Sequence, residues 1–146
     1  MTQDGTEGAA VNGEGQGDRM IPVTEERDIV TARNDGRTLC AEVGFGMTDQ
    51  VKVATAISEL ARNIVLYAGS GEIELREITA EVRGIEIVAR DQGPGIGNLD
   101  AVLAGAHRSQ KGLGLGLLGT KRLMDYFDVQ TGPDCGTTVT VRKFLR

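Results

Sequence analysis

The spacing of apolar residues predicts a short strand followed by a helix. Residues 20–24 suit an edge strand, because Pro22 has no N–H to donate to a sheet. The helix is expected to begin at an Asp28 cap and to reach about Val43, where Gly44 ends it. Its inward positions recur with the helical period, at Ile29, Ala32, Gly36, Leu39, Cys40 and Val43.

A second helix is predicted next, capped by Thr48 or Asp49 and running to about Ala68, with Gly69 as its end. At 100° per residue one face of this helix is apolar. That face is made by Val53, Ile57, Leu60, Ala61 and Ile64.

Alternating apolar and polar residues predict antiparallel strands at 72–79 and 84–91. A helix at 115–127 and strands at 128–131 and 136–143 follow. The segments between are a glycine-rich turn, a short helical stretch and a mobile loop, at 91–97, 98–104 and 105–112. Helices and strands are segregated, so we expect an α+β fold: a two-layer α/β sandwich whose mixed, mostly antiparallel sheet is covered on one face by helices.

Composition separates an N-terminal tail from this domain. Residues 1–18 hold five glycines, four acidic residues and no Lys or Arg, and almost nothing apolar. Such a segment cannot bury enough surface to offset its ordering entropy, so we expect a disordered acidic tail and a folded domain at 19–146. The tail carries most of the net charge of −5, and this charge argues against a nucleic-acid partner, which normally meets a basic patch.

Hydropathy argues for a cytoplasmic protein without a membrane segment. No apolar run approaches the roughly 20 residues that span a bilayer, and the N-terminus lacks the features of a signal peptide. Cys40 and Cys135 show no metal-ligand spacing and are expected to be reduced thiols, and the only histidine is His107.

A first candidate motif places a carboxylate and an amide on one side of the second helix. Glu59 and Asn63 are four residues apart, one above the other, and outside its apolar face. A carboxylate can act as a general base beside an amide that holds a metal. Taken alone, the pair also fits two solvated helix residues.

A second motif is the run Asp91-Gln92-Gly93-Pro94-Gly95 at the end of a strand. Asp91 shares strand parity with Ile85, Ile87 and Ala89, so its carboxylate projects towards a buried region. A buried charge needs a donor, and an adenine amino group would serve. The alternative is an ordinary Gly/Pro turn with Asp91 as its cap.

A third motif is glycine-rich and opens the next predicted helix, at 111–119. Free N–H groups at a helix start suit phosphate. The run contains G-x-G-x-x-G, but no strand precedes it, so a dinucleotide-binding unit is rejected. It also lacks the Gly-Lys-Ser/Thr of a P-loop.

In this order, and with a Gly-Thr pair at 136–137, the motifs resemble the four sequence boxes of the Bergerat (GHKL) ATP-binding fold. The resemblance implies Glu59 as general base and Asn63 as the ligand of Mg²⁺. It implies that Asp91 holds the adenine amino group and that Thr137 contacts adenine through water. The remaining implied ATP contacts are Gly93 and Gly95 at the base and Lys111, Gly112, Gly114 and Gly116 at the phosphates.

Longer stretches, GFGMTDQVKVATAISELARNIVLYAGSG and GLGLGLLGTKRLMDYFDV, resemble the RsbT-type switch kinases. That resemblance implies an ATP-dependent serine/threonine protein kinase of bacterial stress signalling. It would phosphorylate STAS-domain stressosome proteins and activate a partner serine phosphatase by partner switching.

The principal alternative is an RsbW-like anti-sigma factor that binds a sigma factor and phosphorylates an anti-sigma antagonist. The residues after Asn63, Ile64-Val65-Leu66-Tyr67, look more like the switch group. A sensor histidine kinase fragment is discounted, because His107 is the only histidine and lies in the predicted loop.

Overall fold

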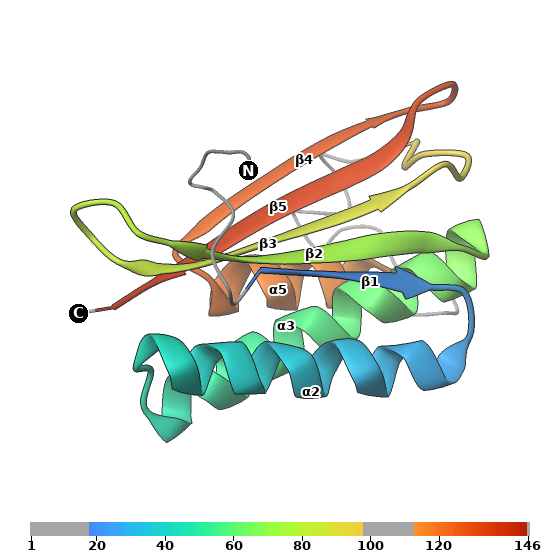
Figure 1. Ribbon diagram of the computed structural model, residues 1–146. Helices are drawn as coiled ribbons and strands as arrows, with labels where there is room; N and C mark the ends of the chain where they lie inside the picture. The colour runs from blue at the N-terminus through green and yellow to red at the C-terminus, as the bar shows by residue number, and fades with distance from the viewer. Residues whose placement is uncertain (1–17, 98–112, 146) are drawn as a thin grey trace, which may run out of the picture.

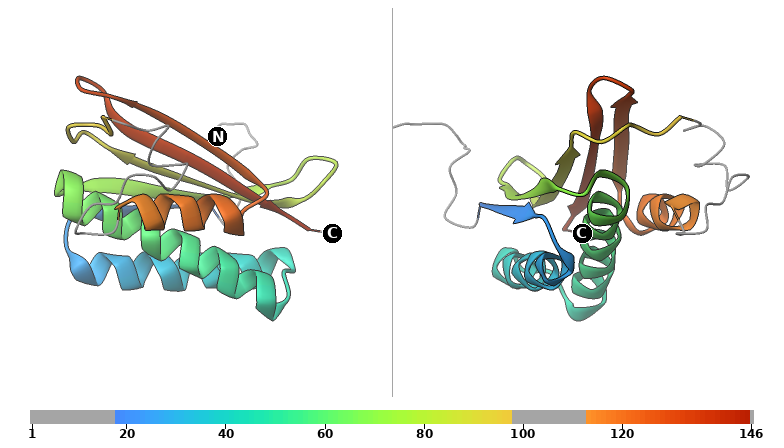
Figure 2. Two further views of the ribbon diagram at one scale, coloured as in Figure 1. Left: turned by 180° about the vertical axis from the view of Figure 1, so that it is seen from behind. Right: turned by 90° about the vertical axis from the view of Figure 1, so that its right-hand side faces the viewer.

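A computed structural model describes residues 18–97 and 113–145 of the chain. Its strands are β1 (Arg19–Val23), β2 (Gly71–Ile78), β3 (Gly84–Asp91), β4 (Tyr126–Gly132) and β5 (Gly136–Phe144), and its helices are α2 (Glu26–Val43), α3 (Met47–Asn63), η1 (Ile64–Ala68) and α5 (Leu113–Leu123). The strands form one five-stranded sheet in the order β1-β2-β3-β5-β4. Helices α2, α3 and α5 cover one face of it (Figure 1), and the end view shows them side by side (Figure 2). The predicted α+β sandwich is therefore confirmed. The sheet was expected to be mixed, but all four of its strand pairings are antiparallel.

Both helix starts differ from the predicted caps. Glu25, not Asp28, is the N-cap of α2, and Asp28 completes a capping box as the third helical residue. The Asp28 carboxylate accepts hydrogen bonds from Thr24 and Glu25, and the Thr24 backbone N–H in particular lowers the pKa of Asp28. For α3 the N-cap is Gly46, without a side-chain cap.

Glycines end both helical segments, as predicted. Gly44 adopts the left-handed conformation that closes α2, and Gly69 stops the helical path after α3. The last turn before Gly69 is the π-helix η1, in which the Gly69 N–H donates to the Ile64 carbonyl at 2.8 Å. This wider turn was not predicted, and it lies directly after Asn63.

The predicted helix 115–127 is too long at its C-terminal end. Helix α5 ends at Leu123, and Tyr126 and Phe127 already belong to β4. Aromatic residues favour strands, and pairing of Tyr126 with Arg142 and of Phe127 with Val141 draws them into the sheet.

The core lies between the helices and the inner face of the sheet. One row of cross-strand partners on this face is apolar, and it consists of Ile21, Ile73, Ala89, Val139 and Val129. The predicted inward positions of α2, from Ile29 to Val43, are all buried. So is the predicted apolar face of α3.

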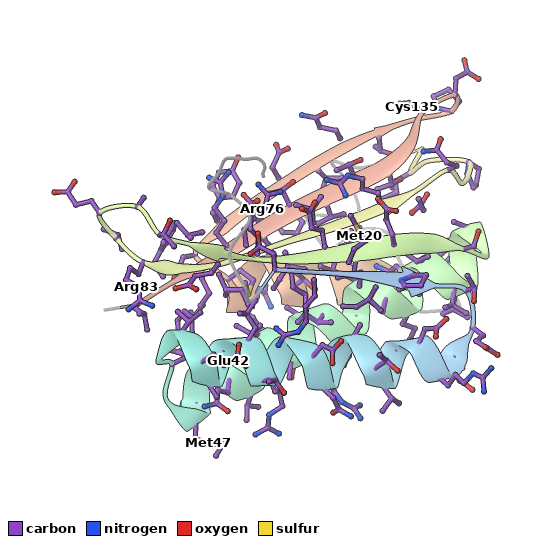
Figure 3. All side chains as sticks on the ribbon, in the orientation of Figure 1. Met20, Glu42, Met47, Arg76, Arg83 and Cys135 are labelled. Carbon is purple, nitrogen blue, oxygen red and sulfur yellow. The ribbon has the colours of Figure 1, made fainter. Side chains whose placement is uncertain are left out.

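The outer face of the sheet is covered by alternating charges instead. Arg90 contacts Glu72 and Glu74, and Arg76 contacts Glu74 and Glu86. Arg142 joins Glu86 to the ring of Tyr126. Figure 3 labels Arg76 on this face.

Several predicted segments lie outside the described residues. They are tail residues 1–17, the helical stretch 98–104 and the loop 105–112, including Lys111 and Gly112. Asp18 at the end of the predicted tail is described, and its side chain accepts a hydrogen bond from the Glu77 N–H at 3.1 Å.

Candidate functional site

A pocket of about 90 Å³ opens between the helix layer and one end of the sheet. Its helix wall is made by Leu60, Asn63, Ile64, Tyr67, Ala68 and Leu117. Its sheet wall and rim are made by Ala89, Asp91, Pro94, Gly95, Ile96, Thr137 and Val139. Mostly apolar walls with a few converging polar groups are typical of a small-molecule site.

The polar side of this pocket is a second row of cross-strand partners, next to the apolar row. Asp91 of β3 pairs with Thr137 of β5, which pairs with Thr131 of β4. The Thr131 and Thr137 hydroxyl oxygens are 2.9 Å apart, and Thr131 also accepts the Ile96 N–H at 2.8 Å. Strand pairing therefore places the Asp91 carboxylate beside the two threonines. Hydrogen bonds link the threonines to each other and to the turn after β3.

Asp91 uses one carboxylate oxygen within its own turn. Oδ1 accepts the Gly93 N–H at 2.8 Å, which is the capping role that a Gly/Pro turn would give it. Among the described residues nothing donates to Oδ2. Asp91 is half-buried and lines the pocket, so the carboxylate both caps the turn and keeps one oxygen without a described donor.

Two glycines let the turn and the β4–β5 hairpin approach each other. A side chain on Gly136 would collide with the Asp91 carbonyl, and one on Gly95 would lie 2.6 Å from the Gly132 carbonyl. Both have positive φ, 68° and 83°, where glycine carries no steric cost. The tip of this hairpin holds Cys135, labelled in Figure 3.

The other end of the pocket brings Glu59, Asn63 and α5 together. A Cβ on Gly116 would be 2.9 Å from the Glu59 Oε1 and 3.7 Å from the Asn63 Oδ1, so a side chain here would displace the Glu59 carboxylate. The Asn63 Nδ2 is buried and has no hydrogen-bond partner among the described residues. Buried donors usually have a partner, so this N–H group is available to an acceptor on a water or a bound molecule. Oε2 of Glu59 accepts a hydrogen bond from Arg62 at 2.6 Å.

The structure thus brings together most of the predicted site residues. Asn63, Asp91, Gly95 and Thr137 line one pocket, and Glu59 and Gly116 meet beside Asn63. Gly93 is not among the lining residues and instead packs against Ala68, where a Cβ would be 2.8 Å away. Gly114 lies in the first turn of α5.

Sequence reasoning missed three residues that the structure adds to the site. Tyr67, which lies in η1, lines the pocket. Thr131 belongs to the predicted strand 128–131 and shares the parity of Val129, and this parity was the signal that it faces inward with Thr137. Arg62 lies three residues after Glu59 on the same helix, and this spacing was the available signal.

A family model described as the histidine kinase-like ATPase domain matches residues 21–143. The chain belongs to this family. Membership means that the domain uses ATP and confirms the predicted fold.

Two curated relatives show which group of histidine kinase-like ATPase domains this chain resembles. Serine/threonine-protein kinase RsbT of Bacillus subtilis is 45% identical over 127 residues, 86% of this chain and 96% of RsbT. An anti-sigma F factor of Bacillus licheniformis is 26% identical over 112 residues, 72% of this chain and 76% of that protein. The chain is therefore a member of the RsbT-like serine/threonine kinases within the family.

A solved structure supports the fold alone. The histidine kinase domain of the blue-light activated histidine kinase EL346 from Erythrobacter litoralis superposes with a TM-score of 0.50 at 16% identity, covering 92% of this chain and 71% of that one. Within residues 18–97 and 113–145 of the ATPase domain, no helix combines the length and apolarity that crossing a membrane requires.

Proposed function

We propose that the chain is a Mg²⁺-ATP-dependent protein kinase that transfers phosphate to a serine or threonine of a partner protein and acts as a partner switch. The observation that carries the proposal is the meeting of Glu59, Asn63 and Gly116 at one end of a pocket whose other end holds Asp91. The similarity to RsbT over nearly its whole length supports the same activity.

The pocket end at β3 and β5 suits adenine. The free Oδ2 of Asp91 is an acceptor for the adenine amino group, and Thr137 lies beside it as its strand partner. Ile64, Ala89 and Val139 supply apolar surface for a flat ring. We propose that Gly95 lines the base, and that Gly93 acts indirectly by seating the turn on Ala68.

The end at α3 and α5 suits the phosphates. Gly114 lies in the first turn of α5, where free N–H groups and the positive end of the helix dipole are found. A helix start of this kind suits phosphate. We propose Lys111, Gly112, Gly114 and Gly116 as the phosphate segment. Asn63 would hold Mg²⁺ through the amide oxygen Oδ1, and its unpartnered Nδ2 is a donor that could meet a phosphate oxygen. The chemistry that bound Mg²⁺ would supply here is neutralisation of phosphate charge.

Glu59 is the group available to act as general base. Its Oε2 is held by Arg62, while its Oε1 faces Gly116 beside Asn63. We propose that the hydroxyl oxygen of the partner bonds to the γ-phosphorus of ATP while ADP leaves. Oε1 of Glu59 accepts the proton of that hydroxyl. Glu59 is only partly buried, with 31% of its side chain exposed, so a partner can present its own hydroxyl from outside.

We propose STAS-domain proteins as substrates and a serine phosphatase as the second partner. Both would use the same face of one small domain, so their binding would be mutually exclusive. Phosphorylation adds negative charge to the substrate and would release it, which frees the domain for the phosphatase.

The test is a transfer assay with γ-labelled ATP, the purified chain and candidate STAS-domain proteins. Label should appear on the partner, should vanish from its Ser/Thr→Ala variant and should fall sharply with Glu59→Gln. Label that stays on the alanine variants, or that appears on no partner, would refute the switch-kinase proposal.

The similarity to an anti-sigma F factor favours a second candidate, an RsbW-like anti-sigma kinase. Capture of a sigma factor by the purified chain in the presence of ATP would support it. Capture of a serine phosphatase in competition with a STAS-domain protein would support the switch kinase instead.

A further inference from the structure

We propose that Lys143 is a positioning residue for phosphate transfer, which holds helix α5 in place at the phosphate end of the pocket. Lys143 lies near the end of β5, whereas Thr137, at the start of the same strand, lines the pocket. The inference rests on the proposed function, because it assumes that α3 and α5 hold the phosphates of ATP between them.

Lys143 is a buried charge on the apolar face of the sheet. It shares strand parity with Val139 and Val141, and only 10% of its side chain is exposed. A buried ammonium is costly unless it is paired and hydrogen-bonded, and an apolar residue of similar volume often serves stability as well or better. The directed contacts of the ammonium, rather than stability, therefore explain why a lysine occupies this position.

These contacts link β5 to α5 and to α3. Nζ of Lys143 donates to the carbonyl of Leu123, the last residue of α5, at 3.3 Å. The same nitrogen lies 3.4 Å from Oδ1 of Asp125, which directly precedes β4, and 4.0 Å from Oδ1 of Asp49 in the first turn of α3. Oδ2 of Asp125 accepts the Phe144 N–H at 2.8 Å. We call the group of Lys143, Leu123, Asp125 and Asp49 the lysine clamp.

The lysine clamp lies at one end of two antiparallel helices, and the phosphate end of the pocket lies at the other. Helix α3 runs from Asp49 at the clamp to Glu59 and Asn63. Helix α5 runs the opposite way, and Gly116 is roughly 10 Å from Leu123 along it, at 1.5 Å per residue. Among the described elements α5 packs closely only against α3 (Figure 2). A tie at the C-terminal end of α5 therefore fixes the angle of this helix, and with it the place of its N-terminal half.

Loss of the lysine clamp should change the phosphate end of the pocket and spare the adenine end. In Lys143→Met an apolar chain of similar length fills the space, but β5 no longer holds the end of α5. The affinity for Mg²⁺-ATP should then fall about three- to tenfold relative to the affinity for adenosine, the worth of one ordinary hydrogen bond at the phosphates. The rate of transfer should fall about ten- to a hundredfold, because a small displacement misaligns the reacting groups.

Asp125→Asn tests the same clamp from the side of the carboxylate. The amide has one oxygen where the carboxylate has two, so in this geometry it can accept from Lys143 or from the Phe144 N–H but not from both. A smaller fall in the ratio of ATP to adenosine affinity is expected. The double variant should lose no more than Lys143→Met alone, because both residues act through one cluster.

The experiment measures dissociation constants of Mg²⁺-ATP and adenosine by calorimetry on the full chain, and single-turnover transfer to a STAS-domain partner. Arg142→Met is the matched control, because Arg142 is the preceding residue on β5 and also pairs with a carboxylate, that of Glu86, on the outer face of the sheet. The ratio of two affinities does not depend on the folded fraction, so a general loss of stability leaves it unchanged. Thermal unfolding shows which variants are folded, and Asp125→Asn carries the test if Lys143→Met is not.

A lower ratio of ATP to adenosine affinity in Lys143→Met and Asp125→Asn, with an unchanged ratio in Arg142→Met, would support the inference. An unchanged ratio in the folded clamp variants, or an equal fall in Arg142→Met, would overturn it and leave Lys143 with a structural role alone. Failure of the unaltered chain to bind Mg²⁺-ATP would instead refute the proposed function.

Discussion

Nη1 of Arg62 lies 2.6 Å from Oε2 of Glu59, one turn earlier on α3. The contact engages one carboxylate oxygen and leaves Oε1 directed at Gly116 beside Asn63. A base that is itself oriented by a third group is a recurring arrangement in catalytic sites.

Arg62→Gln should therefore slow phosphate transfer without changing ATP affinity. Both side chains are partly exposed, so the effect should be modest, about three- to tenfold in kcat. Arg27→Gln removes a similarly short exposed pair with Glu25, 2.7 Å long, whose two residues do not line the pocket, and should change nothing. Equal rates for the two variants, measured by single-turnover transfer, would remove Arg62 from the site.

Glu59→Gln should preserve nucleotide binding and slow transfer by about 10²–10⁴-fold, the usual loss for a general base. Calorimetry and single-turnover transfer on the same preparation separate the two effects. Transfer at the normal rate would mean that another group takes the proton.

Gly116→Ala should separate activity from stability. The added methyl would meet the Glu59 Oε1 at 2.9 Å and displace that flexible carboxylate. Alanine favours a helix over glycine by about 1 kcal/mol, so thermal unfolding should hardly suffer while transfer falls. Gly119→Ala has open space around it and is the control, with stability maintained and full activity. Full activity in Gly116→Ala would contradict the close approach of α5 to Glu59.

Asp91→Asn should weaken ATP binding about 30- to 1000-fold, because the amide can present a donor where the adenine amino group needs an acceptor. Asp128→Asn is a suitable control, since Asp128 pairs with Thr140 of β5, outside the row that contains Asp91, and is not among the lining residues. Unchanged ATP affinity in Asp91→Asn would exclude the adenine role.

Burial raises the pKa of the Cys40 thiol from an ordinary 9.0 to about 12. The folded state thus favours the neutral thiol, and this stabilisation is complete below pH 9 and is lost as pH rises from about 9 to 12. Chemical unfolding at a series of pH values should show a falling free energy of unfolding in that range. The slope should flatten in Cys40→Ala and persist in Cys135→Ala, because Cys135 is exposed. An equal slope in Cys40→Ala would assign it to other groups.

Strand parity and helix periodicity were sufficient to predict much of this site. Ala89 and Val139 are apolar partners, so Asp91 and Thr137, two residues away on each strand, had to share the same face. Glu59 and Asn63 likewise had to lie on one side of α3.

The features that were not predicted from the sequence depend mostly on contacts between distant segments. The Thr131–Thr137 bond needs the register of the β4–β5 hairpin, and Phe127 is a strand residue only because it pairs with Val141. The caps failed for a local reason: Asp28 fits its motif at the third helical position as well as at the cap. Nothing in the run after Asn63 distinguishes a π-turn from an α-turn.

β5 follows β4 along the chain, yet it lies inside the sheet between β3 and β4. Until Gly136–Phe144 has been synthesised, β3 pairs only with β2, and β4 has no strand to join. A ribosome-bound chain that stops before Gly136 would also lack Thr137 and Val139 of the pocket. If ATP binds this pocket as proposed, it can stabilise only molecules whose translation has passed β5, and nascent chains must reach that point without its help.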